Sequence, residues 1–238
     1  MLNVLDIDID LFVDPRASSK PRTGPVVRLG PSHTAWPPGL AKSYIDTLLG
    51  KRGCRFDGSF HESHEAVLTE LLTRGDPVRL FHLDAHADLG IGQITLDFAK
   101  RFLAISKSER INQLGHFAPN EGDWCLYEIA CGIIKEFHYI THPDVRPNLP
   151  DIPIGMDKWE GGEGTGTLTV SRFTGADTEF GDRGRPETPD TSVPLSMHWR
   201  DSIRLTLPSI DLCFITRSPR YTPPESDETF DLLVSSFL

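Results

Sequence analysis

A chain of 238 residues, of which 38% are hydrophobic, is long enough to bury one sizeable core, so we expect a single domain over residues 1–238. Its formal net charge of -10 argues against binding to nucleic acid. The 4 cysteines form no Cys-x-x-Cys pair, which argues against a zinc ribbon or a disulfide framework and fits a reducing cytoplasm. No apolar stretch approaches the length of a membrane span, and the acidic start MLNVLDIDID lacks the basic region of a signal peptide. The sequence therefore predicts a soluble, cytoplasmic protein without a nucleic-acid or membrane partner.

The first half of the chain alternates strand and helix patterns. Apolar and acidic residues alternate in LNVLDIDIDLF, which predicts a strand with Asp6, Asp8 and Asp10 on one face. In SHEAVLTELLTRG, Ser63 is a candidate N-cap and Gly75 ends the helix. The predicted elements are a strand over 2–12, a long loop over 15–40, helices over 41–53 and 63–75, and a buried strand that starts at 78 and enters HLDAHAD.

The second half continues this alternation around one unusual segment. Residues 144–200 are rich in Pro, Gly, Thr and Asp, so we expect a long loop excursion with one hairpin, shaped around a ligand or mobile. The other predicted elements are helices over 94–105 and 120–137, a strand over 137–143, strand character over 204–219 and a closing helix over 225–237. Strands that alternate with helices indicate a mostly parallel sheet covered on both faces, a three-layer α/β/α fold.

The stretch HLDAHAD places ionisable residues at alternate positions directly after an apolar run. On a strand, His82, Asp84, His86 and Asp88 would share one face. Burying such groups is costly without a partner, and a divalent metal ion is the natural one. His82 lies one pleat deeper than the others, so we interpret it as a residue behind the ligands or a core residue.

Further candidate ligands lie at the same edge of the predicted sheet, because ligands of a parallel α/β sheet bind beyond the carboxyl ends of its strands. Asp8 and Asp10 end the first strand, and His64 opens the helix that leads into HLDAHAD. Together with Asp84, His86 and Asp88 they form a carboxylate-rich set that suits Mn²⁺ better than structural Zn²⁺. Six ligands exceed the need of one ion, so we expect two Mn²⁺ per chain, about 3.5–4 Å apart, that generate a hydroxide nucleophile at neutral pH.

DAHAD, with a histidine at the head of the preceding helix, resembles the dinuclear manganese motif of the arginase/agmatinase (ureohydrolase) superfamily. The resemblance implies an arginase-like fold. It also implies that His64, Asp84, His86 and Asp88 are metal ligands, with Asp88 relaying a proton.

An Asp-x-Asp on a strand completes the ligand set in that superfamily, and here the sequence departs from the pattern. The motif usually comes late in the chain, whereas the best match here, DIDIDLFVDP, is N-terminal. We favour Asp8 and Asp10, because Asp14-Pro15 also echoes the family pattern. Asp6 and Asp8 form the alternative register. A late candidate, SIDLCF, has Cys213 in place of its second acid, and Asp211 is then an additional ligand or a substrate contact.

The segments DIDIDLF, SHEAV, HLDAHADL, NEGDW and RSPRYTPP together resemble the peptide arginases. These enzymes convert arginine side chains of ribosomally made precursor peptides to ornithine, so the expected partner is an arginine-containing precursor peptide. Glu121 and Asp123 of NEGDW are candidates for contacting the guanidinium group, and Glu121 is also a candidate catalytic residue. His116 is a candidate proton shuttle.

Three other functions remain open at this point. One is hydrolysis of a small guanidino compound, as in agmatinases and arginases. A second is a phosphatase of the haloacid-dehalogenase type, because VLDIDIDLFVD resembles the first motif of that family; it would leave HLDAHAD without a role. The third is a non-enzymatic, metal-stabilised scaffold that binds a peptide through its loops.

Overall fold

An eight-stranded sheet, in the order β4-β10-β1-β5-β6-β9-β8-β7, forms the centre of the protein. The computed structural model describes residues 1–17, 25–90, 101–117, 119, 121–144, 154–157, 164–174, 185–202 and 204–238. The strands of the sheet are β1 (Leu2–Asp8), β4 (Asp57–His61), β5 (Val78–Leu83), β6 (Ile134–Thr141), β7 (Ile154–Asp157), β8 (Gly164–Thr174), β9 (Arg185–Trp199) and β10 (Leu212–Thr216). Six of them, from β4 to β9 in the sheet order, are parallel; β8 then pairs antiparallel with β9, and β7 pairs antiparallel with β8. The prediction of a mostly parallel α/β sheet is therefore confirmed.

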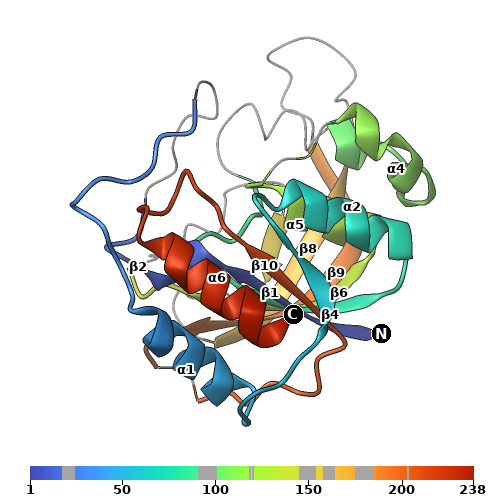
Figure 1. Cartoon of the computed structure of the whole chain (residues 1–238). Coiled ribbons are helices and arrows are strands. Elements are labelled where there is room, and N and C mark those ends of the chain that lie inside the picture. The colour runs from blue at the N-terminus through green and yellow to red at the C-terminus, as the bar shows by residue number, and fades with distance from the viewer. Residues whose placement is uncertain are drawn as a thin grey trace.

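Helices lie on both faces of this sheet (Figure 1). The helical elements are η1 (Ile9–Phe12), α1 (Pro38–Leu48), α2 (Glu65–Arg74), α4 (Lys107–Gln113), η2 (Leu114–His116), α5 (Trp124–Cys131) and α6 (Ser226–Phe237). Two short strands, β2 (Val13–Asp14) and β3 (Thr34–Ala35), form a separate antiparallel pair. Residues 101–104 are also helical, whereas residues 94–100 of the helix expected over 94–105 lie outside the described residues.

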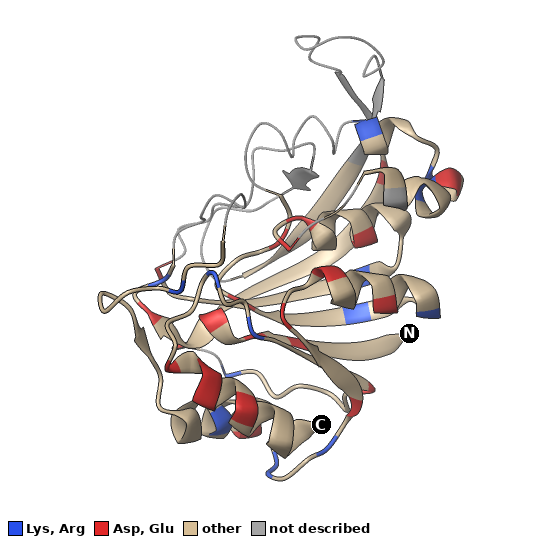
Figure 2. Ribbon diagram, turned by 45° about the horizontal axis from the view of Figure 1, so that its top comes forward, with Lys and Arg blue, Asp and Glu red and all other residues tan. Residues whose placement is uncertain are grey.

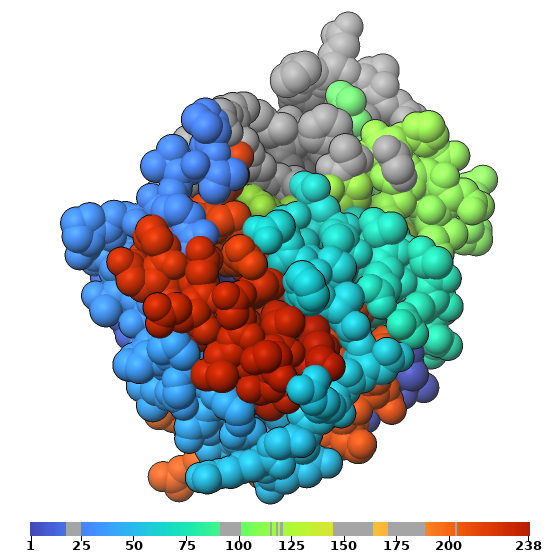
Figure 3. Space-filling model, in the orientation of Figure 1, coloured from blue at the N-terminus to red at the C-terminus, as the bar shows by residue number. Residues whose placement is uncertain are grey.

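Two hydrophobic cores lie between the sheet and the helices on its two faces. One core packs α2 and α5 against β5, β6, β8 and β9. The other packs α1 and α6 against β1 and β10. Each core excludes apolar surface from water and so holds its helices on the sheet. In the space-filling view, α6 packs against the N-terminal part of the chain on one side and the β4–α2 segment on the other (Figure 3).

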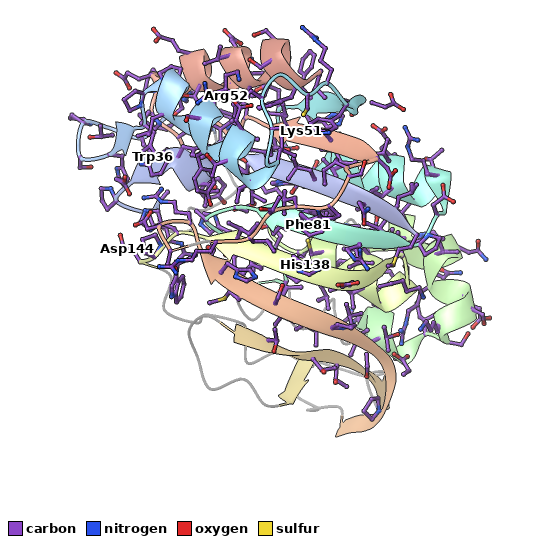
Figure 4. All side chains as sticks on the ribbon, turned by 90° about the horizontal axis from the view of Figure 1, so that it is seen from below. Trp36, Lys51, Arg52, Phe81, His138 and Asp144 are labelled. Atoms are coloured by element: carbon purple, nitrogen blue, oxygen red, sulfur yellow. The ribbon has the colours of Figure 1, made fainter. Side chains whose placement is uncertain are left out.

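The layer formed by α1 and α6 is incomplete. Viewed from that side, the two helices lie over the β4, β10 and β1 half of the sheet, and no described helix covers β6 and β9 (Figure 4). On this open part of the face, His138 stacks on Phe81 with ring centroids 4.6 Å apart and donates or accepts a hydrogen bond with Glu136 at 2.8 Å. The described fold is thus three-layered over part of the sheet only.

Residues 144–200 correct the expectation of a loop excursion. The hairpin is present as β8 and β9, but β9 also pairs in parallel with β6 and extends the central sheet. Leu168, Val193 and Met197 are almost fully buried, so this segment contributes to the core despite its content of Gly, Pro and Thr. Residues 145–153 and 175–184 lie outside the described part.

The edge strand β4 was not predicted, because DGSFH carries little apolar pattern. It pairs in parallel with β10. A Cβ atom at Gly58 would lie only 1.8 Å from the carbonyl oxygen of Cys213, so the close approach of these strands requires glycine there. The described residues contain no helix long and apolar enough to cross a membrane, and none of the four cysteines forms a disulfide.

Candidate metal centre

Acidic and imidazole side chains converge at the carboxyl edge of the parallel strands. In Figure 2, the loops at this edge, opposite to the N label, carry acidic and basic residues close together. The converging side chains come from β1, from η1, from the residue before α2, from β5 and from the loop after β5, and all are buried: Asp6, Asp8, Asp10, His64, His82, Asp84, His86 and Asp88.

Asp8 ends β1 and turns the chain toward the centre. Its carboxylate accepts the backbone N–H of Asp10 at 2.9 Å and so caps η1. Ser218, which follows β10, donates its hydroxyl to the other oxygen of Asp8. Because the chain enters a 3-10 turn at Ile9, Asp10 reaches the centre from this turn and not from a continued strand face as predicted.

The DAHAD segment is a loop, which corrects the prediction that its residues share one strand face. β5 ends at Leu83. The backbone N–H of His86 then donates to Asp84 Oδ1 at 2.6 Å, and Asp88 adopts a left-handed conformation with φ 50°. Such a conformation is costly for a residue other than glycine and is typical of functional sites. The turn brings Asp84, His86 and Asp88 together where the strand ends.

His64 occupies the N-cap position of α2, but its side chain makes no capping hydrogen bond. The imidazole instead faces the carboxylates, with nitrogen–oxygen distances of 3.2 Å to Asp6, 3.3 Å to Asp88 and 3.5 Å to Asp8. Ser63 therefore does not cap the helix as expected. The position before a helix places His64 at the edge where the parallel strands end.

Two groups of ligand atoms within this cluster match the geometry of a metal site. Asp8, His64 and Asp84 form one group, and Asp10, Asp84 and His86 form the other, with ligand atoms within 4.8 Å of one another in each. Asp84 is common to both. Two further groups contain His82: one with Asp6 and His64, the other with Asp84 and Asp88.

His82 is already tied to the protein on both sides of its ring. Its Nδ1 lies 2.7 Å from Asp6 Oδ2, and its Nε2 lies 3.1 Å from the carbonyl oxygen of His86. The Asp6–His82 pair therefore supports the cluster from behind, as the sequence suggested for His82. Asp6 joins Asp8 and Asp10 in the cluster, so β1 and η1 deliver three acids instead of two.

Crowding of the carboxylates changes their pKa values. Burial, and then the negative charges of Asp10 and Asp84, raise the pKa of Asp8 well above its usual range. Burial and Asp84 also raise the pKa of Asp10, and they raise that of Asp88 to about 8. These carboxylates repel one another in a buried site, and a divalent cation between them would relieve that repulsion.

The pKa values of the histidines are also raised, which for an imidazole favours the charged form. Burial lowers the pKa of His64, but the carboxylates of Asp6, Asp88 and Asp8 together outweigh it and raise the pKa well above the usual value. For His86, burial is likewise outweighed by the combined effect of Asp10 and Asp84. For Asp84, burial is outweighed by hydrogen bonding to His86 and by the charge of His82, so its pKa is lowered.

The donor set also fits a metal ion by its unused atoms. His64 Nε2, His86 Nε2 and Asp6 Oδ1 are buried, and none has a hydrogen-bond partner among the described residues. Buried polar atoms normally have such partners. Imidazole nitrogens and carboxylate oxygens are ligands for Mn²⁺ and Zn²⁺, so the residues present fit a divalent metal of this kind.

Sequence reasoning missed three side chains that contact the cluster. Trp124 donates its indole N–H to Asp88 Oδ2 at 2.7 Å and stacks on His64, with ring centroids 5.4 Å apart. Ser218 donates to Asp8, and the ring of Tyr221 lies 5.0 Å from that of His86. The segments NEGDW and RSPRYTPP, which contain these residues, were noted for their resemblance to peptide arginases. The resemblance did not indicate which of their residues reach the site.

The other candidate residues lie in different surroundings. Asp123 is buried and begins α5 next to Trp124, Glu121 is half-buried in the same loop, and His116 is exposed in η2. Among the described residues, neither Glu121 nor His116 contacts the metal cluster. Gly90 donates its N–H to Gly122 at 2.8 Å, so the loop itself lies directly beside the end of the DAHAD segment.

Asp211 and Cys213 are excluded from the site. Asp211 accepts the backbone N–H of Asn3 at 2.8 Å at the amino end of β1, which is the opposite edge of the sheet. It is therefore neither a ligand nor a substrate contact. Cys213 is buried in the core beneath α1 and α6, so the late Asp-x-Asp register is wrong.

No model of a known protein family, no curated protein and no solved structure matches the chain. The site geometry and the residue pattern therefore carry the functional argument.

Proposed function

We propose that the protein is a metal-dependent hydrolase that cleaves the guanidinium group of an arginine side chain in a ribosomally made precursor peptide, giving ornithine and urea. The observation that supports it best is the convergence of Asp8 and Asp10 with His64 and the DAHAD acids in one buried cluster. These residues come from three segments that are far apart in sequence, and they are the ones that we expected as ligands from the sequence. The resemblance supplies the substrate chemistry; the cluster supplies the ligands.

Two divalent ions, preferably Mn²⁺, would be held by the two groups that share Asp84. When bound, such ions lower the pKa of water and so provide a nucleophile at neutral pH. This explains why the reaction needs no serine, cysteine or lysine nucleophile.

The chain's own residues orient this chemistry. Ser218 and the N–H of Asp10 fix the two oxygens of Asp8, and Trp124 fixes Asp88 Oδ2. In the proposed reaction Asp88 accepts a proton from the attacking water and passes it to the departing ornithine nitrogen. Burial of the cluster keeps bulk water away from these groups, which strengthens their electrostatic effect.

Metal analysis and mass spectrometry test this proposal together. The purified chain is loaded with Mn²⁺, its metal content is measured, and it is incubated with free arginine and with arginine-containing peptides. We expect two ions per chain and a loss of about 42 Da from the peptides, which corresponds to release of urea after addition of water. One ion or none would reject the dinuclear centre. Urea from free arginine with peptides untouched would instead indicate a small-molecule ureohydrolase.

Asp88→Asn separates an enzyme from a binding scaffold. The enzyme should lose turnover, whereas a metal-stabilised scaffold should still bind peptide. Retained turnover would remove Asp88 from the proposed mechanism.

A further inference from the structure

Arg16 lies beside the candidate metal centre, where a single peptide group separates it from Asp84. Its Nε–H donates to the carbonyl oxygen of Ala85 at 2.7 Å. The N–H of that same peptide group, which belongs to His86, donates to Asp84 Oδ1 at 2.6 Å. Asp84 belongs to both groups that could hold a metal ion. Two hydrogen bonds in series therefore link the guanidinium of Arg16 to the middle of the cluster.

The charge of Arg16 has no acidic partner among the described residues. Arg200 and Arg217, which follow β9 and β10 at the same edge of the sheet, form ion pairs with Asp14 and Glu62 respectively. Arg16 is half-buried, and the carbonyl of Ala85 is its one hydrogen-bond partner among the described residues. An arginine is always charged, and removing its charge partly from water is unfavourable without a counter-ion.

Arg16 and the metal cluster have one buried neighbour in common, Tyr139. Tyr139 is buried on β6 with its ring stacked against His82 at 5.7 Å. Burial and the charge of Asp84 raise the pKa of Tyr139, while the charge of Arg16 lowers it. The same buried phenol therefore lies within the electrostatic reach of Arg16 and of the metal cluster.

A carboxylate is the group that fits Arg16. Because Nε is already used, the two terminal nitrogens remain, and they can bind both oxygens of one carboxylate side by side. In a loaded centre, the charges of Asp8, Asp10, Asp84 and Asp88 are balanced by two divalent ions. The guanidinium of a substrate would then add a second positive charge near Arg16, and a carboxylate on the same substrate would offset it.

We propose that Arg16 forms an anion-binding subsite that takes a carboxylate of the arginine-bearing substrate. This inference rests on the proposed function and narrows its substrate class. The carboxylate has two possible sources: the α-carboxylate of a free or C-terminal arginine, or the side chain of an aspartate or glutamate next to the arginine in a peptide. The peptide-modifying function favours the second source.

The test measures binding of product-like ligands to the Mn²⁺-loaded protein by calorimetry, so that no turnover occurs. One pair of ligands is Nα-acetylornithine and its amide, which differ in the α-carboxylate. The other pair is the amides of acetyl-Orn-Asp and acetyl-Orn-Asn, which differ in the neighbouring acid. We expect one acidic ligand to bind about 10- to 100-fold more tightly than its neutral partner, because the bond is charge-assisted. The pair that shows the preference identifies the source.

Arg16→Gln should remove that preference and leave both the metal content and the affinity for neutral ligands unchanged. Arg16→Lys keeps the positive charge but cannot bind both oxygens of a carboxylate side by side, so this variant should retain part of the preference for acidic ligands. Arg52→Gln is the matched control, because this substitution changes the net charge by the same amount. Arg52 is exposed in the segment before β4 and is labelled in Figure 4. This control should bind like the unmodified protein.

Three results would overturn the subsite. They are no preference for the acidic ligands in the unmodified protein, a preference that persists in Arg16→Gln, or an equal loss for acidic and neutral ligands accompanied by loss of metal. The last result would mean that Arg16 only supports the Asp84 loop. The proposed function fails separately, if the unmodified Mn²⁺-loaded protein releases urea from none of the corresponding arginine compounds.

Discussion

Trp124→Phe removes one hydrogen bond from the candidate metal centre while keeping an aromatic ring against His64. The indole N–H donates to Asp88 Oδ2 at 2.7 Å, and the side chain is fully buried, so water cannot replace the lost donor without rearrangement. A hydrogen bond to a charged group contributes about 1.5–3 kcal/mol. Since about 1.4 kcal/mol corresponds to a factor of ten, metal affinity should fall by about 10- to 100-fold.

Titration with Mn²⁺ in competition with a chelating dye measures this loss. The smaller ring also leaves a cavity that destabilises the fold by roughly 1–2 kcal/mol, so stability must be measured alongside. Trp36→Phe is the matched control, because the indole of Trp36 donates to Asp14 at 2.8 Å, and Asp14 is not in the cluster. The control should lose some stability and no metal affinity. Equal metal affinity in both variants would refute the inference that Trp124 supports the metal centre through Asp88.

Two further predictions follow from other buried groups. Asp10→Asn should reduce metal content and abolish turnover with the fold retained, whereas Cys213→Ala should leave metal content unchanged. Elemental analysis measures the metal content, and circular dichroism checks the fold. Loss of metal in Cys213→Ala but not in Asp10→Asn would mean that β10 and not η1 provides the ligand. Burial raises the pKa of Glu128 well above its ordinary value of 4.5, so the folded state holds this proton more tightly than the unfolded state. The free energy of unfolding should therefore fall as pH rises from about 4.5 toward the raised pKa. Glu128→Gln should show a flatter curve in urea unfolding between pH 5 and 8, and curves of equal slope would contradict it.

The membership of the metal cluster could be predicted from sequence because its residue types are unusual for the places they occupy. Aspartates and histidines at the end of an apolar strand have few structural roles, and parallel strands bring their carboxyl ends to one edge. The detailed geometry could not be predicted. DAHAD is a loop with Asp88 in a left-handed conformation, and Asp10 belongs to a 3-10 turn. Both depend on hydrogen bonds between carboxylates and the backbone that leave no pattern in the sequence.

The largest error in the predicted fold was the loop expected over residues 144–200. It came from judging the segment by its amino-acid composition and not by the alternation of its apolar and polar residues. Residues 144–200 contain turn-forming residues, which predicted a loop, yet the buried apolar residues Val193, Leu195 and Met197 alternate with Ser192, Pro194 and Ser196, as in a strand. Leu168 and Val170 show the same period on β8. Strands with one open face have only half of their residues in a core, so their average composition resembles that of a loop.

Contacts that support the cluster connect residues far apart in the chain, which explains why sequence analysis identified ligands but not their neighbours. Trp124 is 36 residues from Asp88, Arg16 is 69 residues from Ala85, and Ser218 is 210 residues from Asp8. No local period encodes such pairs. Only the sheet order, which places β1 between β5 and β10, brings these segments to one edge.

The position of β1 also connects the metal centre to the fold itself. This strand is central, and its Asp6 is fully buried between β5 and β10, where His64 and His82 compensate its charge. Acids in such a strand oppose folding unless positive charge is present, because burying an uncompensated carboxylate is costly. A bound cation would therefore stabilise the folded state as well as provide reactivity, since a ligand that binds only the folded chain shifts the folding equilibrium toward it.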